Sequence, residues 1–196
     1  MSSMLDAILQ AVSSPSIASW PVYASVLAVL LTLFILVLWW RGRSVSTIGK
    51  SLAAVSIEQL TDVVLPKADD GDIHIAHILL TERGILVVDI RDISGIVFGS
   101  DKMRDWTIMQ DGRRFTIPNP QEALLDRIAA VKLAVGKGAV DGCVIFSDGA
   151  DFSKGRPSLV RTESDFRKEW AIREPNTARA AHDMAWTALR DATFRA

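Results

Sequence analysis

The residues with the clearest chemical potential are Asp89 and Arg91, which stand two positions apart in the apolar run ILVVDIR. Side chains two apart in a β-strand point to the same face, so this spacing predicts a carboxylate beside a guanidinium. A carboxylate on a strand can hold a divalent metal ion, and a neighbouring cation can stabilise an anionic transition state. The same two residues can equally form a surface ion pair, which contributes little to stability. The spacing alone leaves both interpretations open.

The elements that must position these two residues are predicted by apolar periodicity and by turn residues. Asp-Gly at 111–112 lies between two alternating runs and is typical of a two-residue β-hairpin turn. Asn119 and Pro120 are suited to a helix N-cap and first turn, and Glu122 is placed for a capping box. Strands are expected at 60–66, 72–80, 85–91, 96–98, 106–110, 113–117, 139–147 and 158–161, and helices at 47–58, 119–136, 163–172 and 176–193. Strands followed by helix, strand and helix indicate an α/β layer structure with a mixed sheet.

Two consecutive strands, two glycines before a tryptophan, and Asn-Pro at the start of a helix follow one another in a recognisable order. This order resembles that of the NERD (nuclease-related) domain family, a relative of the restriction-endonuclease-like fold. The resemblance covers about residues 47–147, the length of one domain core. It is carried by AHILLTERGILVVDIRDISGIVFGSDKMRDW (76–106) and IPNPQEALLDRI (117–128), with Gly84, Gly95, Gly99, Trp106, Asn119 and Pro120 as its markers. It implies a mixed-sheet restriction-endonuclease-like core with flanking helices.

The resemblance also implies a metal-dependent site that hydrolyses phosphodiester bonds. In the family's pattern, a Glu on the first helix, an Asp on one strand and Glu-x-Lys on the next strand form this site. Lys50 and Ala76 stand at the first two of these positions, and Asp89 and Arg91 stand at the third. One carboxylate therefore remains of three, and one carboxylate rarely holds Mg²⁺ without help from the substrate. We favour a degenerate site, in which Asp89 and Arg91 are remnants of catalytic positions and no cofactor is bound.

The alternative to a degenerate site is an active site in which other residues replace the lost carboxylates. His74 lies two residues before Ala76 on the same predicted strand face, about 7 Å along the strand. Asp89 and His74 are then the predicted ligands of a Mg²⁺ ion, although imidazole is a poor ligand for that metal. A glutamine that the family carries in the next helix is either displaced to Gln121 or absent.

The first forty residues differ in composition from the rest of the chain. Trp20 to Trp40 contains no charge, and a helix of that length spans about 32 Å, roughly one hydrocarbon core. The first Lys or Arg is Arg41, so the positive-inside rule places the N-terminus outside and the remainder in the cytoplasm. A buried core helix is the alternative. We expect a single-pass protein of the cell membrane with an extracytoplasmic segment at 1–19, a transmembrane helix at 20–40, a linker at 41–46 and a cytoplasmic NERD-like domain at 47–196.

Charge and cysteine content exclude several classes of protein. The chain has 22 Lys+Arg against 23 Asp+Glu, and this balance excludes a generally basic, nucleic-acid-coating protein. A single cysteine, Cys143, excludes a disulfide framework and a cysteine-rich zinc site, and its apolar surroundings predict a core position. Four basic residues lie in and near the predicted hairpin: Lys102, Arg104, Arg113 and Arg114. They form either a phosphate-binding rim or a solvated loop, and the acidic residues interleaved with them favour the loop.

Three functions are compatible with these features. The first is a membrane-anchored, noncatalytic module that tethers a protein partner or nucleic acid at the cytoplasmic face. The second is an active metal-dependent nuclease with a rearranged site. The third is a structural subunit of a membrane complex. We favour the first, with the lipid bilayer and a protein of a membrane complex as partners, because the carboxylates are lost and the part after residue 40 has no net charge.

Overall fold

The structure is a computed structural model of the chain, and it describes residues 20–66, 71–173 and 175–195. Within helices and strands, the side chains at 20–22, 37–47, 175–178 and 195 are not part of this description. The predicted extracytoplasmic segment at 1–19 lies outside the described residues. The chain divides into two units, Met1–Ser46 and Thr47–Ala196, and each is described by itself.

The first unit contains the N-terminal part of one long helix, α2 (Trp20–Val55). The helix continues without a break through residues 41–46, where a linker was expected. Its described side chains between Tyr23 and Leu36 are exposed and largely apolar, with Phe34 exposed to 63%. Among the residues that the structure describes, no helix is long and apolar enough to cross a membrane. The transmembrane helix at 20–40 therefore stays a prediction from the sequence.

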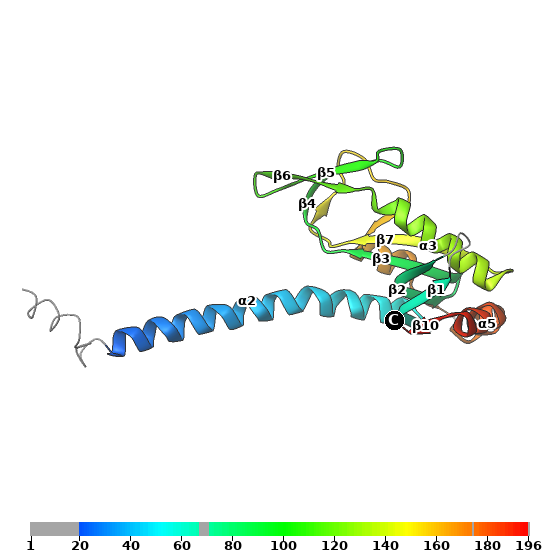
Figure 1. Ribbon diagram of the computed structural model, residues 1–196, viewed down its shortest axis with the longest axis horizontal. Coiled ribbons are helices and arrows are strands. Elements are labelled where there is room, and N and C mark those ends of the chain that lie inside the picture. The colour runs from blue at the N-terminus through cyan, green and yellow to red at the C-terminus, as the bar shows by residue number, and fades with distance from the viewer. Residues whose placement is uncertain (1–19, 67–70, 174, 196) are drawn as a thin grey trace, which may run out of the picture. The chain divides into compact units, whose positions relative to one another are not determined.

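The second unit is built on a six-stranded mixed sheet (Figure 1). Its strands, in the order β10-β1-β2-β3-β7-β9, are β10 (Phe194–Arg195), β1 (Glu58–Pro66), β2 (Asp72–Thr81), β3 (Gly84–Arg91), β7 (Val140–Phe146) and β9 (Val160–Thr162). Strands β1, β2 and β3 form an antiparallel meander, whereas β7 runs parallel to β3 and β9 runs parallel to β7. A parallel pair requires a crossover, and the chain between β3 and β7 supplies it through a hairpin region and a helix.

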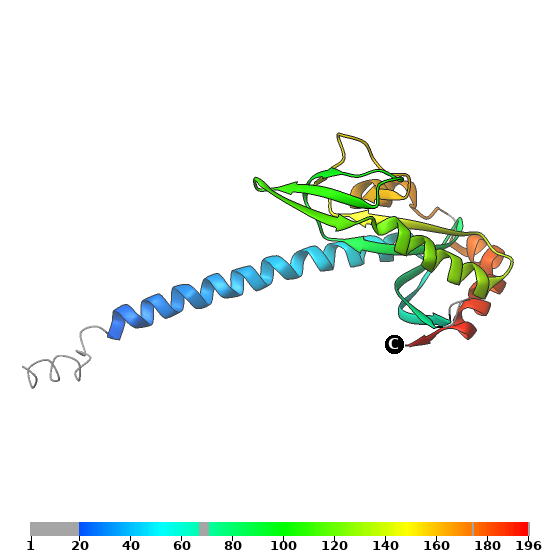
Figure 2. The same cartoon turned by 45° about the horizontal axis from the view of Figure 1, so that its top comes forward.

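Three strands of this crossover and one short strand after β7 form a smaller four-stranded sheet. Its order is β6-β5-β4-β8, with β4 (Gly95–Phe98), β5 (Asp105–Gln110), β6 (Arg113–Pro118) and β8 (Ala150–Asp151). Asp111 and Gly112 have φ values of +51° and +72°, and a type I′ turn needs positive φ at both positions. The predicted β5–β6 hairpin is therefore confirmed, and Figures 1 and 2 show it projecting beyond the larger sheet.

Helices cover both faces of the larger sheet. One hydrophobic cluster joins Ile85 and Val87 of β3 to α3 (Pro120–Val135) and α5 (Pro175–Ala192). The other joins Leu86 and Val88 to residues 48–55 of α2 and to α4 (Glu163–Glu169). Alternate residues of β3 thus enter two different cores, which explains why its sequence is apolar at almost every position. The predicted α/β class with a mixed sheet and flanking helices is confirmed.

The start of α3 follows the predicted capping chemistry with one difference. Asn119 Oδ1 accepts a hydrogen bond from the backbone N–H of Gln121 at 3.0 Å, and Pro120 occupies the first helical position. The capping box with Glu122 was a wrong prediction. The backbone N–H of Asn119 instead donates to the carbonyl of Arg104 at 2.8 Å, so the partner that Glu122 needed is already in use.

Candidate functional site

Two of the glycines that carry the family resemblance, Gly84 and Gly99, stand where the chain leaves no room for a side chain. A Cβ at Gly84 would lie 2.5 Å from the carbonyl oxygen of Ala139, and its φ of +120° disfavours other residues. A Cβ at Gly99 would lie 2.5 Å from the ring of Trp106, which is completely buried and stacks on Phe146. The first contact sets the start of β3 against the residue before β7, and the second packs the segment after β4 onto Trp106 of β5.

Asp89 lies near the end of β3 and is the centre of a small basic cluster. Its Oδ2 accepts a hydrogen bond from Nη2 of Arg91 at 2.7 Å and one from Nη1 of Arg127 at 3.3 Å. The Asp89 side chain is 15% exposed, against 38% for Arg91 and 25% for Arg127. The prediction that Asp89 and Arg91 share a strand face is confirmed. Their carboxylate and guanidinium are paired with each other rather than held apart.

Arg127 is the member of this cluster that we did not predict from the sequence. It comes from the middle of α3 and also donates from Nε to the backbone carbonyl of His74 at 3.1 Å. A signal for it was present, because Arg127 lies three residues after Leu124 and directly before Ile128, which are both buried. A charged residue on the apolar stripe of a helix needs a partner of opposite charge. The sequence did not indicate that Asp89 is that partner.

His74 does not join Asp89 among the contacts of the described residues. Its side chain is 53% exposed, and its Nε2 lies 3.5 Å from a carboxylate oxygen of Asp62. The prediction assumed unbroken alternation along β2, but Ile75 and Ile78, three residues apart, both enter the same core cluster. The interruption lies opposite Asp62, which has φ of +51°. His74, next to Ile75, is therefore turned to the other face.

A second histidine lies closer to the cluster. Burial lowers the pKa of His77, while the negative charges of Asp62 and Asp89 act in the opposite direction. Nδ1 of His77 and Nε of Arg91 are both buried without a hydrogen-bond partner among the described residues. His77 lies opposite Val88 in the register of β2 and β3, one position from Asp89.

The donor set around Asp89 does not fit Mg²⁺. Two guanidinium groups already occupy one oxygen of the carboxylate. A guanidinium keeps its charge at neutral pH, so it does not make way for a metal ion by losing a proton. In the part of the chain that the structure describes, no three His, Cys, Asp or Glu side chains are grouped to hold a metal ion. Lys50, which the resemblance aligns with the family's Glu, is exposed. No step through a metal ion can be derived from these residues.

Gln121 is held by the fold rather than presented to a substrate. It is 4% exposed, its Nε2 donates to Asp101 at 3.1 Å, and its Oε1 accepts from the backbone N–H of Leu159 at 3.0 Å. Hydrogen bonds from Ser158 and Gln121 lower the pKa of Asp101. The loop that precedes β5 is thereby fastened to the start of α3. Asp101 therefore accepts hydrogen bonds from Gln121 and from the backbone of Ser158, and its role is structural.

The remaining candidate residues are either buried in the core or exposed on the surface. Cys143 is 3% exposed in β7, as predicted, and burial raises the pKa of its thiol to about 12. The basic residues of the hairpin region are all exposed, and the structure places them around the smaller sheet: Lys102, Arg104, Arg113 and Arg114.

Comparison with known proteins places this site in a family. No curated protein and no solved structure was found that matches the chain. The NERD family, described as the nuclease-related domain, matches residues 50–147, which is half of the 196-residue chain. The matched stretch begins in α2, contains β1 to β6 and α3, and ends just after β7, so it includes Asp89, Arg91 and Arg127. The chain therefore belongs to the NERD, or nuclease-related domain, family.

Proposed function

We propose that this protein is a noncatalytic NERD module, anchored in the membrane by residues 20–40, that tethers a protein partner at the cytoplasmic face. One observation carries the loss of catalysis: the Asp89 carboxylate is already neutralised by Arg91 and Arg127. Family membership supports an origin among nucleases, and the geometry at Asp89 favours a function other than hydrolysis.

The physical argument concerns what a metal ion would have to displace. A divalent cation at Asp89 would meet two positive charges that already lie within 3.3 Å of one oxygen of its carboxylate. Repulsion between like charges at such distances is strong where water is partly excluded. Mg²⁺ also keeps its affinity only where several oxygen ligands converge. The side chains at Asp89 therefore favour the ion pairs over metal binding.

The activity is tested with the full-length protein, plasmid DNA and single-stranded DNA in the presence of Mg²⁺ or Mn²⁺. We expect no cleavage, and no increase in melting temperature with metal. Asp89→Asn is the matched variant, because it removes the charge and keeps the shape of the side chain. Cleavage by the wild-type protein that Asp89→Asn abolishes would contradict the proposal, whereas equal background activity in both supports it.

The membrane anchor is supported by the uncharged stretch from Trp20 to Trp40 and by the basic residues that begin at Arg41. The described apolar side chains of this stretch are more than half exposed, which leaves a large apolar surface to be covered. The substitutions Leu30→Arg and Phe34→Arg each cost about 3 kcal/mol in a bilayer centre. We expect the double variant to leave the membrane fraction. Leu133→Arg, at an exposed leucine of α3, is the control and should not change fractionation.

The orientation is tested by labelling a new thiol. Asp111→Cys places a thiol at the exposed tip of the β5–β6 hairpin, and the natural Cys143 is buried with its pKa raised to about 12, so it reacts little. A membrane-impermeant maleimide should label Asp111→Cys only after the cells are permeabilised. Labelling in intact cells would overturn the cytoplasmic placement.

The kind of partner is tested separately. Balanced charge disfavours a site that depends on many phosphate contacts, and this supports a protein over nucleic acid. We expect no gel shift of DNA or RNA at physiological salt. A gel shift whose affinity falls steeply with salt concentration would instead identify nucleic acid as the partner.

A further inference from the structure

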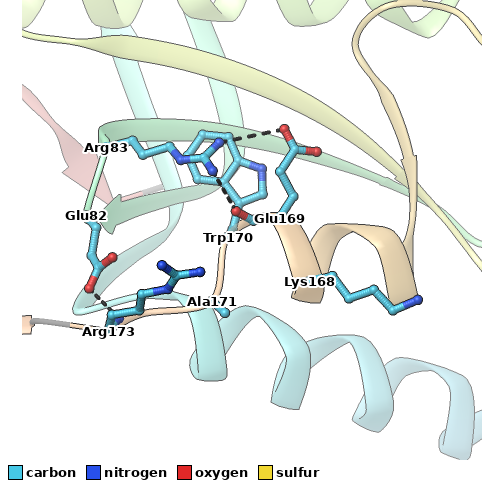
Figure 3. Close-up of a pocket in the computed structure, with 7 residues that line it drawn as sticks. All are labelled: Glu82, Arg83, Lys168, Glu169, Trp170, Ala171 and Arg173. Carbon is cyan, nitrogen blue, oxygen red and sulfur yellow. Dashed lines mark hydrogen bonds and ion pairs between the residues drawn. The ribbon is translucent and has the colours of Figure 1, made fainter.

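A second cluster of charged side chains surrounds a pocket at the opposite end of β3 from Asp89. The pocket has a volume of about 220 Å³ and opens between the β2–β3 turn, the end of α4 and the segment that follows it. Arg83 and Asp89 are six positions apart, so the two clusters lie about 20 Å apart along an extended strand. The lining is predominantly polar and charged (Figure 3): Glu82, Arg83, Lys168, Glu169, Trp170, Ala171 and Arg173.

Both carboxylates of this pocket are already engaged by other parts of the chain. Glu82 Oε1 accepts a short hydrogen bond from the backbone N–H of Arg173. Glu169 accepts from Nε of Arg161 at 2.5 Å, and its other oxygen lies 3.7 Å from Nη1 of Arg83. Glu169 lies closer to Arg161 than to Arg83, so its negative charge compensates the charge of Arg83 only in part.

The cations of the pocket differ in how far they are engaged. Arg83 is fixed in place, since Nη2 donates to the Glu169 carbonyl at 2.9 Å and the guanidinium lies 5.0 Å from the Trp170 ring centroid. Within the described residues, no hydrogen bond or ion pair engages the guanidinium of Arg173 or the ammonium of Lys168. Figure 3 shows the guanidinium groups of Arg83 and Arg173 directed toward the same space. The lining thus carries three cations and two carboxylates, although the Lys168 ammonium points away from the two guanidinium groups in Figure 3.

We propose that this pocket, named here the Arg83 pocket, binds a small phosphate-type oxyanion between Arg83 and Arg173. Two guanidinium groups that face one space repel each other, and an oxyanion between them removes that repulsion and accepts several charge-assisted hydrogen bonds. The volume is below that of pockets for drug-sized ligands, so the ligand is a phosphate group with few further atoms. The site uses none of the residues around Asp89 and goes beyond the tethering function.

The test uses isothermal titration calorimetry of the full-length protein in detergent with inorganic phosphate, up to about 10 mM. A site with two charge-assisted contacts is expected to bind with a Kd of about 1 mM or tighter. Arg173→Gln should weaken binding about tenfold, since it removes one charge-assisted contact. It should leave the melting temperature unchanged, because the guanidinium has no partner among the described residues. Arg113→Gln, at an exposed arginine of the hairpin, is the matched control and should bind phosphate as the wild type does.

The outcomes separate the proposal from its competitors. Binding by the wild type and by Arg113→Gln, together with loss in Arg173→Gln, supports the Arg83 pocket. Absence of heat in the wild type, or equal affinity in all three proteins, overturns it. A further arm replaces phosphate with phosphatidylcholine vesicles that contain phosphatidic acid. Binding to these vesicles without binding to inorganic phosphate would assign the surface to a membrane and overturn the proposal of a small ligand.

Discussion

The two ends of strand β3 carry the same kinds of side chain in different states of pairing. At one end, Arg91 and Arg127 both bond the single carboxylate of Asp89. At the other end, Arg83 shares its carboxylate with a second arginine, and Arg173 has no side-chain partner in the described part of the chain. The number of charges alone therefore does not distinguish a cluster that is saturated internally from one that can take a ligand. The decisive property is whether the cations already have internal acceptors.

The largest effect is expected from breaking the Arg83 end of the strand. In Gly84→Ala, the new methyl group would meet the carbonyl of Ala139 at 2.5 Å, and a φ of +120° would be strained. We expect the free energy of unfolding to fall by about 3 kcal/mol, measured by urea titration. Gly155→Ala is the control, because its φ is +123° with nothing within 4 Å, and it should cost about half as much. Equal losses would show that the contact with Ala139 does not matter.

The second-largest loss of stability is expected from removing the Asp89 carboxylate, which accepts the hydrogen bonds of two arginines at the other end of β3. Asp89→Ala leaves Arg91 and Arg127 without their carboxylate in a partly buried position. We expect a loss of about 2 kcal/mol in the free energy of unfolding, less than for a fully buried pair. Asp92→Ala, at an exposed position three residues further on, should change stability by no more than about 0.5 kcal/mol. If the two variants are equally stable, the Asp89 cluster is only a surface ion pair.

A smaller effect is expected when metal binding is rebuilt. Ala76 stands opposite Asp89 in the register that pairs His77 with Val88. Ala76→Asp combined with Arg127→Gln therefore places two carboxylates on one strand face and removes one competing cation. With Mn²⁺ at about ten times its Kd, stability should rise by about 1.4 kcal/mol, or roughly 3–5 °C in melting temperature. Arg127→Gln alone should show no such rise, and a similar rise would assign the metal to another site.

The smallest effect concerns protonation of His77. Burial holds its pKa below 6.5 in the folded state, so the unfolded chain takes up the proton first as pH falls. The stability contributed by neutral His77 is therefore present above about pH 6.5 and is lost below it. Asp89→Asn removes a charge that raises this pKa, so the pKa should fall further and the loss of stability with acid should steepen. Urea titrations from pH 7.5 to 5.5 measure the slope, and His77→Gln should flatten it. An unchanged slope in Asp89→Asn would separate the histidine from the cluster.

Helices and strands can be predicted from this sequence where turn or capping residues mark their ends. Asp111 and Gly112 specify the hairpin turn, because few other residue pairs tolerate positive φ at both positions. Asn119 and Pro120 specify the start of α3 in the same way. The adjacency of Asp89 and Arg91 follows from the two-residue period of a strand. In each case the cause and its consequence lie within a few residues.

Features that depend on distant contacts could not be predicted in this way. Arg127 reaches Asp89 from 38 positions away, and only the packing of α3 on the sheet brings them together. The displacement of His74 depends on the positive φ of Asp62 in the neighbouring strand, which the sequence of β2 does not contain. Strands β8 and β10, of two residues each, are too short to show a period. The same reasoning applies to the Arg83 pocket, since two segments far apart in the sequence form it, one at 82–83 and one at 168–173.

The pairing of β10 with the outer edge of β1 has a consequence for synthesis. Glu58, at the start of β1, accepts a hydrogen bond from Trp186, which is made 128 positions later, and β10 is made later still. At cellular translation rates this interval lasts roughly ten seconds. During that time the part of the β1 edge that β10 covers, at Val63 and Val64, has no strand beside it and can pair with another nascent chain. We therefore expect a chaperone that covers exposed strand edges to increase the yield of this domain.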